Sequence, residues 1–329
     1  MKVLITGGAG FLGRRLAHKL LERGHLIGSG GNEEPVDEIV LLDVVRPDGC
    51  ADSRVRAVAG DICDGELLAD LLDKDTTSVF HLAAIVSGQA EADFDLGMRI
   101  NVDATRRLLD RCRAHARPPR LVFTSSIAVY GGDLPDTVQD STALLPQSSY
   151  GTQKAIAELL IHDYSRRGFI DGRVLRVPTI SVRPGKPNKA ASSFASGIIR
   201  EPLAGVEATC PVAPGTRLWL SSPRAAIENL VHGHELPAQR LGANRMVNLP
   251  GVSVRAAGMV SALETVAGKE VAALVRWEHD AAIARIVSSW PGELDCSRAT
   301  ALGFQRDPDF ASIIRAYVED DLRSPQRSA

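Results

Sequence analysis

Strand-like and helix-like segments alternate through the first half of the chain, and this alternation constrains the fold more than any other feature. Short runs rich in β-branched and aliphatic residues occupy positions 2–6, 38–43, 55–59, 78–82, 120–124 and 173–177. Between them, residues 11–23 and 101–115 carry apolar side chains at helical spacing. Such alternation is typical of a parallel sheet whose right-handed crossovers cover both faces. We therefore expect an α/β fold of the Rossmann type, with a doubly wound parallel sheet.

The regular alternation stops after residue 177. Prolines at positions 178, 184, 187, 202, 211, 214 and 223 divide the following sequence into loops and short elements. Helical patterns return at 253–267, 280–289 and 310–321, and a polar, glycine-rich loop is expected earlier, at 28–35. We predict a Rossmann domain over residues 1–177 and a smaller α/β domain over residues 178–329, with an approximate boundary across which strands can return.

Composition excludes several classes of partner. A formal net charge of −2 over 329 residues provides no basic surface for nucleic acid or for an anionic membrane, so a small metabolite is the simpler ligand. No run approaches the roughly 18 apolar residues that span a bilayer. Five cysteines are scattered without a C-x-x-C pair, as in a reduced protein of the cytoplasm, which is where we expect it. We expect no metal site, because the close histidine pair His232 and His234 has only Glu235 as a nearby carboxylate.

A glycine cluster follows the first predicted strand with the spacing G-x-x-G-x-x-G. Gly7 allows a tight turn, Gly10 allows the backbone to approach a pyrophosphate, and Gly13 allows the next helix to pack near the sheet. The N-terminus of that helix would then face the phosphates. The cluster predicts a dinucleotide site that includes the intervening Phe11 and Leu12. A purely structural turn is the plainer interpretation, and the downstream motifs favour the cofactor.

Acidic residues after the next strands indicate which dinucleotide is bound. Asp43 ends a predicted strand, where its carboxylate can accept hydrogen bonds from the ribose hydroxyls of NAD and repel the 2′-phosphate of NADP. Arg46 leaves NADP open as an alternative, because a guanidinium can hold a phosphate. Asp61 and Ile62 are expected beside the adenine, although Asp61 is also a candidate helix cap.

Other strand ends complete the predicted cofactor site. The small residues Ala83 and Ala84 let the chain pass close to the cofactor. Asn101 is assigned to the site as a residue that holds the neighbouring strand by bonds from its side chain to the backbone, and its alternative role is a helix N-cap. Pro178 and Thr179 are expected to line the nicotinamide side.

A proton-transfer group is predicted beside this cofactor. Tyr150 and Lys154 are four residues apart, which places both on one face of a helix. A tyrosine ordinarily has a pKa of about 10, and an adjacent ammonium together with the positive nicotinamide ring favours its phenolate. Ser126, at a strand end, can donate to the substrate oxygen, and we prefer it to Ser125. The alternative is that these serines only satisfy backbone groups.

These motifs resemble those of the extended short-chain dehydrogenases/reductases of the nucleoside-sugar epimerase type. The matching segments are Thr-Gly-Gly-Ala-Gly-Phe-Leu-Gly at 6–13, His-Leu-Ala-Ala at 81–84, Ser-Ser-Ile-Ala-Val-Tyr-Gly at 125–131 and Tyr-x-x-x-Lys at 150–154. The resemblance covers essentially the whole chain and implies NAD-dependent chemistry with Ser126, Tyr150 and Lys154 as the catalytic residues. Helices like those near 101–115 and 153–167 form a dimer interface in this family, so we expect a homodimer.

The second half resembles one subgroup of that family, the D-erythronate dehydrogenases. Residues 175–194 carry most of this likeness, with 85–91 and 217–224. The resemblance implies oxidation of the 2-hydroxyl of a small sugar acid, D-erythronate, to 2-oxo-tetronate with NAD. A hydroxy acid needs a cation for its carboxylate and polar groups for its hydroxyls. The candidate substrate-binding residues are Ser87, Ser126, Tyr150, Arg183 and Asn188, with Gln89, Lys186, Lys189, Ser192 and Ser193 as further polar groups.

Two other functions stay open from the sequence. A nucleotide-sugar epimerase with tightly bound NAD would use the same catalytic residues, and the basic segment 183–189 can hold a pyrophosphate. A non-catalytic NAD-sensing regulator is the second, although the presence of Ser126, Tyr150 and Lys154 argues against it. Each cation of 183–189 is also a candidate for an ordinary solvated loop charge.

Overall fold

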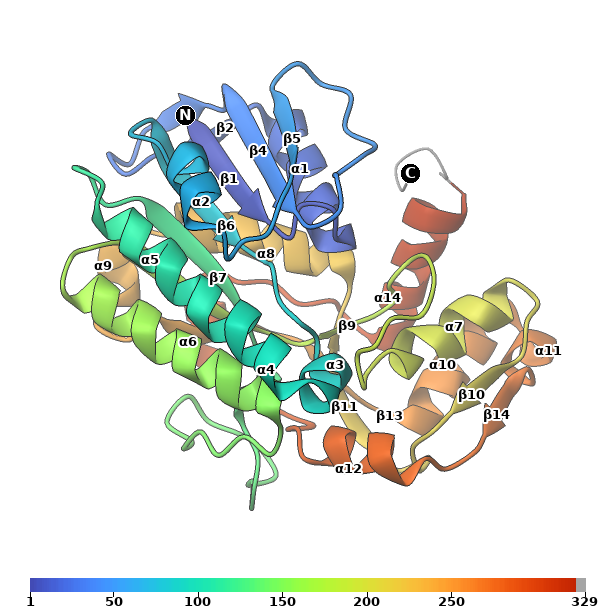
Figure 1. The fold of residues 1–329 in the computed structure, drawn as a ribbon. Helices are drawn as coiled ribbons and strands as arrows, with labels where there is room; N and C mark the ends of the chain where they lie inside the picture. Colours follow the sequence, from blue (N-terminus) through green and yellow to red (C-terminus); the bar gives the residue numbers. More distant parts are fainter. Residues whose placement is uncertain (324–329) are drawn as a thin grey trace.

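One parallel sheet organises the protein, for which a computed structural model describes residues 1–323 (Figure 1). The sheet has seven strands in the order β12-β8-β7-β6-β1-β4-β5. The chain builds outward from β1 through β4 and β5, and then in the other direction through β6, β7 and β8. Ligands of open α/β sheets bind at the carboxyl ends of the strands where the order reverses, which here is between β1 and β6. The strands are β1 (Lys2–Thr6), β4 (Glu38–Asp43), β5 (Val55–Ala59), β6 (Thr76–His81), β7 (Arg120–Ser126), β8 (Asp171–Val177) and β12 (Met246–Asn248).

Helices cover both faces of the sheet, because successive residues of a strand point to opposite sides. Val3 and Ile5 of β1 belong to an apolar cluster shared with α1 and α8, whereas Leu4 belongs to the cluster shared with α2, α5 and α6. Figure 1 shows α5 and α6 side by side across one face. This arrangement confirms the predicted Rossmann-type fold class. The helices are α1 (Phe11–Arg23), α2 (Gly65–Leu71), α5 (Thr105–Arg113), α6 (Ser149–Arg166) and α8 (Pro223–Glu235).

The second half of the chain builds a separate apolar cluster and also returns to the sheet. Ile198 of α7, Leu218 of β11, Met259 of α10 and Ile313 of α14 pack together in that cluster. Between these elements the chain returns to the large sheet. There α8 packs against β7 and β8, and β12 adds to the sheet by pairing with β8. The elements are β9 (Thr179–Ile180), α7 (Phe194–Leu203), β10 (Ala208–Cys210), β11 (Arg217–Ser221), α9 (Ala238–Leu241), β13 (Val252–Arg255), α10 (Ala256–Ala267), α11 (Lys269–Ala272), β14 (Val275–Trp277), α12 (Ala281–Ser288), α13 (Ser297–Ala301) and α14 (Phe310–Tyr317), followed by a π-helical turn, η3 (Val318–Leu322).

Several local details differ from the sequence expectations. The predicted polar loop at 28–35 is the turn and second strand of a hairpin formed by β2 (His25–Ile27) and β3 (Glu33–Pro35). The helix expected from residue 253 begins only at Ala256, because the preceding residues pair with β11 as β13. The helix expected at 101–115 starts earlier, as the π-helix η1 (Met98–Ala104) that leads into α5. The short elements near the sheet edge are α3 (Ser87–Ala92), α4 (Phe94–Gly97) and η2 (Ile127–Val129).

No helix within residues 1–323 is both long enough and apolar enough to cross a membrane. The same residues contain no group of three or more His, Cys, Asp or Glu side chains arranged to hold a metal ion.

Candidate active site

Two cavities open at the carboxyl edge of the sheet, one on each side of the glycine loop. The first cavity extends from the loop toward the second half of the chain, and its lining includes Ser126, Tyr150, Lys154 and Arg183. The second cavity extends toward β4 and β5, and its lining includes Asp43. Gly7 and Gly10 line both cavities, as do Leu82 and Ala84 at the end of β6. The two cavities together form one continuous surface around the switch point of the sheet.

The glycine loop leaves no room for side chains where it passes β6 and α1. Gly7 has φ of 74°, in the left-handed region, and a Cβ there would lie 2.9 Å from the backbone nitrogen of Ala83. A Cβ on Gly13 would lie 2.3 Å from the carbonyl oxygen of Gly7. The first turn of α1, which begins after Gly10, carries no acidic residue. This cradle fits a pyrophosphate, since free N–H groups and the positive end of the helix dipole meet there without a competing carboxylate.

The second cavity carries the two acidic residues assigned to the adenosine half of a dinucleotide. Asp43 ends β4, and its Oδ2 accepts a hydrogen bond from the backbone N–H of Ala9 at 3.0 Å. Asp61 accepts from the N–H of Cys63 at 2.8 Å and pairs with Arg99 at 2.9 Å, and these contacts lower its pKa. The alternative role of Asp61 as a helix cap is wrong, because Asp64 caps α2. The cavity lining also contains Ile62, Ala83 and Ala84.

Asn101 lies behind the cavities rather than in their walls. Its Oδ1 accepts from the N–H of Ile85 at 2.8 Å, and its Nδ2 donates to the carbonyl of Ile85 at 3.0 Å. Nδ2 also donates to Oε1 of Gln153 at 2.7 Å. The residue sits inside η1, so the N-cap alternative is wrong, and its side chain fixes the backbone that follows β6.

Tyr150 and Lys154 lie on the first turns of α6, which Ser148 caps by accepting from the N–H of Gly151 at 3.2 Å. Nζ of Lys154 donates to the carbonyl of Thr124 at 2.8 Å and lies 5.8 Å from the centre of the Tyr150 ring. Burial lowers the pKa of Lys154 to about 7, against an opposing effect of Glu158. The amine is therefore held at a fixed point beside the phenol, with a charge that responds to its surroundings near neutral pH.

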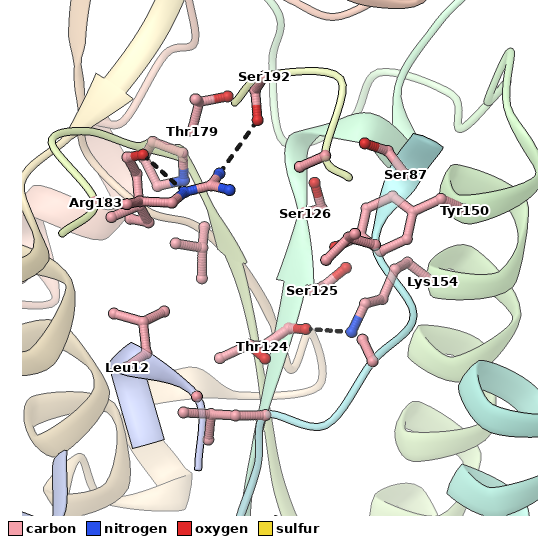
Figure 2. Close-up of a pocket in the computed structure, with 18 of the residues that line it drawn as sticks. Leu12, Ser87, Thr124, Ser125, Ser126, Tyr150, Lys154, Thr179, Arg183 and Ser192 are labelled. Carbon is pink, nitrogen blue, oxygen red and sulfur yellow. Dashed lines mark hydrogen bonds between the residues drawn. The ribbon is translucent and has the colours of Figure 1, made fainter. Parts of the chain in front are cut away.

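The hydroxyl of Tyr150 shares the first cavity with Ser126 and Arg183 (Figure 2). Burial raises the pKa of Tyr150, while a hydrogen bond with the hydroxyl of Ser126 and the charge of Arg183 act to lower it. The sequence argument named Lys154 and the nicotinamide ring as the groups that favour the phenolate. In the chain itself the groups that act to lower the pKa of Tyr150 are Ser126 and Arg183, and burial outweighs both, so the expected contribution of Lys154 is not found.

The two neighbouring serines of β7 have different surroundings. Ser125 donates to the buried carboxylate of Glu158 at 2.5 Å, and that carboxylate is paired with Arg176 at 2.7 Å. Ser126 accepts from the N–H of Ala128 at 3.1 Å and keeps its own proton available toward Tyr150 and the cavity. This difference matches the preference for Ser126 as the residue that contacts the substrate oxygen.

Arg183 lies at the wall of the first cavity that faces Tyr150, and several hydrogen bonds hold it there. Its Nε donates to the carbonyl of Ile180 at 3.1 Å, and its Nη2 donates to Oγ of Ser192 at 3.2 Å. Its backbone N–H donates to Oγ of Ser196 at 3.0 Å, and its carbonyl accepts from Arg200 at 2.8 Å. Figure 2 shows the guanidinium across the cavity from Tyr150. A side chain anchored this way presents its remaining N–H groups to an anion without losing further freedom.

The other predicted substrate residues separate into those that reach the first cavity and those that do not. Ser87 and Asn188 line it, as do Pro178 and Thr179, whereas Lys186 and Lys189 are exposed and lie outside the lining. The sequence analysis missed Trp290, which lines the cavity after α12. No local motif marks this residue, because its position depends on how the last third of the chain packs against the sheet edge.

The fold and these two cavities define a dinucleotide-dependent oxidoreductase of the Rossmann type. The pattern of the NAD dependent epimerase/dehydratase family matches residues 3–216. The chain belongs to this family and is an NAD-dependent oxidoreductase.

Three known proteins are similar over nearly their full length. A D-erythronate dehydrogenase of Cupriavidus necator is 64% identical over 320 residues, which is 97% of this chain and 98% of that protein. A D-erythronate dehydrogenase of Haemophilus influenzae is 48% identical over 98% of this chain and 100% of its own. The crystal structure of a nucleoside-diphosphate-sugar epimerase from Agrobacterium tumefaciens superposes with a TM-score of 0.92 at 44% identity, covering 98% of this chain and 95% of that one.

Proposed function

We propose that this protein oxidises the 2-hydroxyl of D-erythronate to give 2-oxo-tetronate. One observation carries the proposal: the first cavity presents the fixed Arg183 opposite the hydroxyls of Ser126 and Tyr150, with no carboxylate among its described lining residues. A monoanion with several hydroxyls complements such a surface. An amino acid does not, because its ammonium would lose water without gaining an acidic partner. The two similar proteins named D-erythronate dehydrogenase support the same substrate.

In this proposal three residues carry the proton transfer. NAD, when bound, supplies the acceptor for the hydride that leaves C2 of the acid. Tyr150 accepts the proton of the 2-hydroxyl as that oxygen becomes a carbonyl oxygen, and Ser126 donates a hydrogen bond to the same oxygen. Lys154, fixed on the carbonyl of Thr124, favours the phenolate whenever its amine is protonated. Carboxylate binding is assigned to Arg183, with Ser87 and Asn188 for the remaining hydroxyls.

Cofactor binding is assigned to the glycine loop and the strand ends around it. The pyrophosphate would lie over Gly10 at the start of α1, and Asp43 would accept hydrogen bonds from the adenosine ribose. We assign residues 1–177 to the cofactor domain and 178–329 to the substrate domain, apart from α8 and β12, which return to the sheet; residues 324–329 lie outside the described part. The full set is Gly7, Gly10, Phe11, Leu12, Gly13, Asp43, Asp61, Ile62, Ala83, Ala84, Asn101, Tyr150, Lys154, Pro178 and Thr179.

The decisive experiment follows NADH absorbance in the presence of NAD and one candidate substrate at a time. We expect NADH to accumulate with D-erythronate, and much more slowly with D-threonate, because the configuration at C2 decides whether the hydrogen on that carbon faces the cofactor. L-Threonine should give no signal, since the cavity offers no partner to its ammonium. Equal rates with L-threonine and D-erythronate would contradict the proposal.

A nucleotide-sugar epimerase is the second candidate, because the Agrobacterium tumefaciens structure is described as a nucleoside-diphosphate-sugar epimerase. An epimerase returns the hydride to its substrate in every turnover, so it produces no net NADH. Incubation with a UDP-sugar therefore separates the two functions. Conversion of the sugar without NADH, combined with no reaction of any hydroxy acid, would favour the epimerase.

We further propose that the protein is a cytoplasmic homodimer. The free state of all five cysteines is compatible with a reducing compartment. Dimerisation is assigned to α5 and α6, where the side chain of Leu159 is 60% exposed on a helix that otherwise packs against the sheet. We expect Leu159→Asp to convert a dimer into a monomer in sedimentation equilibrium. An unchanged mass in the variant would place the interface elsewhere.

A further inference from the structure

The loop formed by residues 184–191 connects the proposed carboxylate-binding residue to α7. Its two ends are joined by the hydrogen bond from Nη2 of Arg183 to Oγ of Ser192 at 3.2 Å. Inside the loop, the N–H of Ala190 donates to Oδ1 of Asn188 at 3.0 Å, and the N–H of Asn188 donates to Oγ of Ser193 at 3.2 Å. Asn188 and Ala190 line the first cavity, so the shape of this loop sets the position of one cavity wall.

The loop touches the cofactor half of the molecule at Ser87 and Gly88, which we call the loop seat. Oγ of Ser87 accepts from the N–H of Ala191 at 3.0 Å, and both residues are buried. A Cβ on Gly88 would lie 2.4 Å from the carbonyl oxygen of Lys189. That oxygen belongs to the backbone, so it cannot move aside unless the loop moves with it. The absence of a side chain at position 88 is therefore what allows the loop to approach this closely.

The loop seat is fixed relative to the proposed base. Asn101 holds Ile85, two residues before the seat, by hydrogen bonds of 2.8 and 3.0 Å to its N–H and carbonyl. Within α3, Oε2 of Glu91 accepts from the N–H of Ser149, the residue before Tyr150, at 2.9 Å. The seat and Tyr150 are therefore held in fixed positions relative to each other. The 184–191 loop rests on the seat near Ala191, and Arg183 precedes its first residue.

We propose that Gly88 is a specificity-determining residue, which seats the 184–191 loop and so limits the substrate to a four-carbon acid. This inference rests on the proposed function. An acid whose carboxylate is on Arg183 and whose 2-hydroxyl is on Ser126 and Tyr150 directs the rest of its chain toward the wall of Ser87, Asn188 and Ala190. When the loop rests on the seat, this wall is closed. The extra hydroxymethylene group of a five-carbon acid would then have to displace the loop.

The test compares Gly88→Ala with Gly197→Ala. Both glycines are helical, but a Cβ at Gly197 would meet only the carboxylate of Glu201 at 3.6 Å, an ordinary contact. In Gly88→Ala we expect kcat/KM for D-erythronate to fall about tenfold, the effect of a modest steric displacement. We expect kcat/KM for a five-carbon aldonic acid of the same C2 configuration to rise or stay level. Gly197→Ala should leave both unchanged, and the Kd for NAD should be the same in all three proteins.

Limited proteolysis gives a readout that does not depend on the substrate. In the segment 183–191, trypsin can cut only after Lys189, because Arg183 and Lys186 both precede proline. We expect trypsin to cut Gly88→Ala after Lys189 several times faster than it cuts the native chain or Gly197→Ala. One fragment would end at residue 189 and the other would begin at residue 190. Failure of the native enzyme on every sugar acid would refute the proposed function, and the cleavage rate would still decide whether Gly88 seats the loop.

Two outcomes would overturn the inference. Unchanged cleavage at Lys189 in Gly88→Ala would mean that the loop does not depend on the seat. Equal losses of kcat/KM for the four-carbon and five-carbon acids would mean that Gly88 affects stability or catalysis in general and not the length of the substrate. Ser87→Ala removes the hydrogen bond to Ala191 without adding bulk, and we expect it to accelerate cleavage at Lys189 as Gly88→Ala does.

Discussion

Tyr150→Phe should lower kcat for D-erythronate oxidation by about 10³-fold, the range expected when a positioned general base is removed. The substitution deletes one oxygen and leaves the ring, so α6 and the cavity wall should keep their shape. Tyr150 is one of the residues assigned to NAD, but the substitution keeps its ring, and the contacts assigned to the glycine loop and Asp43 do not involve its hydroxyl. We therefore expect the Kd for NAD, measured by protein fluorescence, to change by less than about twofold.

Tyr164→Phe provides the matched control for Tyr150→Phe. Tyr164 lies on the same helix, but its hydroxyl bonds to Asp110 at 2.5 Å, away from both cavities. This variant should retain full activity. A residual rate in Tyr150→Phe above about a tenth of the native rate would rule out Tyr150 as the base.

The pH profile gives a second test of the same assignment. The phenolate of Tyr150 becomes more abundant as pH rises, and burial raises the pKa of this group, so native kcat should rise with pH on the alkaline side. The residual rate of Tyr150→Phe should lack that rise. An unaltered profile in the variant would assign the titration to another group.

The parts of the site that could be predicted from the sequence are those encoded in short contiguous patterns. A glycine loop has to follow a strand and start a helix, so Gly7, Gly10 and Gly13 specify their own surroundings. Tyr150 and Lys154 are one helical turn apart, so their shared face follows from helix geometry alone. The alternation of strands and helices likewise predicted the sheet, because each crossover is a local unit.

The parts that could not be predicted depend on packing between distant segments. Trp290 reaches the first cavity only through the arrangement of the second half against the sheet edge. The sequence named Arg183 as a substrate residue with Lys186 and Lys189 as further cations, and it could not show which of them binds the carboxylate. Bonds to Ile180 and Ser192 hold Arg183 at the cavity, and neither lysine lines it. Periodicity also misjudged residues 253–255, since pairing with β11 overrides their helical pattern.

A buried ion pair next to β7 explains why Ser125 and Ser126 have different roles. Glu158 and Arg176 are paired at 2.7 Å with almost no exposure, and the carboxylate also accepts from Ser125. A buried carboxylate needs several such partners to stay ionised. Both serines line the first cavity, but the hydroxyl of Ser125 is committed to Glu158, while Ser126 lies on the opposite side of the strand with its hydroxyl free of that carboxylate.

Arg183→Gln should lower kcat/KM for D-erythronate by about 10²–10³-fold, mainly through KM. Two hydrogen bonds from a guanidinium to a carboxylate are each worth about 1.5–3 kcal/mol, and a neutral amide replaces them only in part. Because the charge of Arg183 also acts to lower the pKa of Tyr150, its loss should move the rise of kcat to higher pH. Arg183→Lys should restore the position of that rise but only part of the affinity, since an ammonium lacks the planar fork.

Lys186→Gln is the matched control for Arg183→Gln, because it removes the same charge from an exposed position in the same loop. Solvent and salt screen an exposed charge within about 8–10 Å, so this variant should change KM by less than about twofold. If Lys186→Gln raised KM as much as Arg183→Gln, the acid would be attracted by the general positive charge of the loop. If only Arg183→Gln raised KM, and raised it for D-erythronate but not for the neutral polyol erythritol, the carboxylate would be bound by direct contact with that one guanidinium.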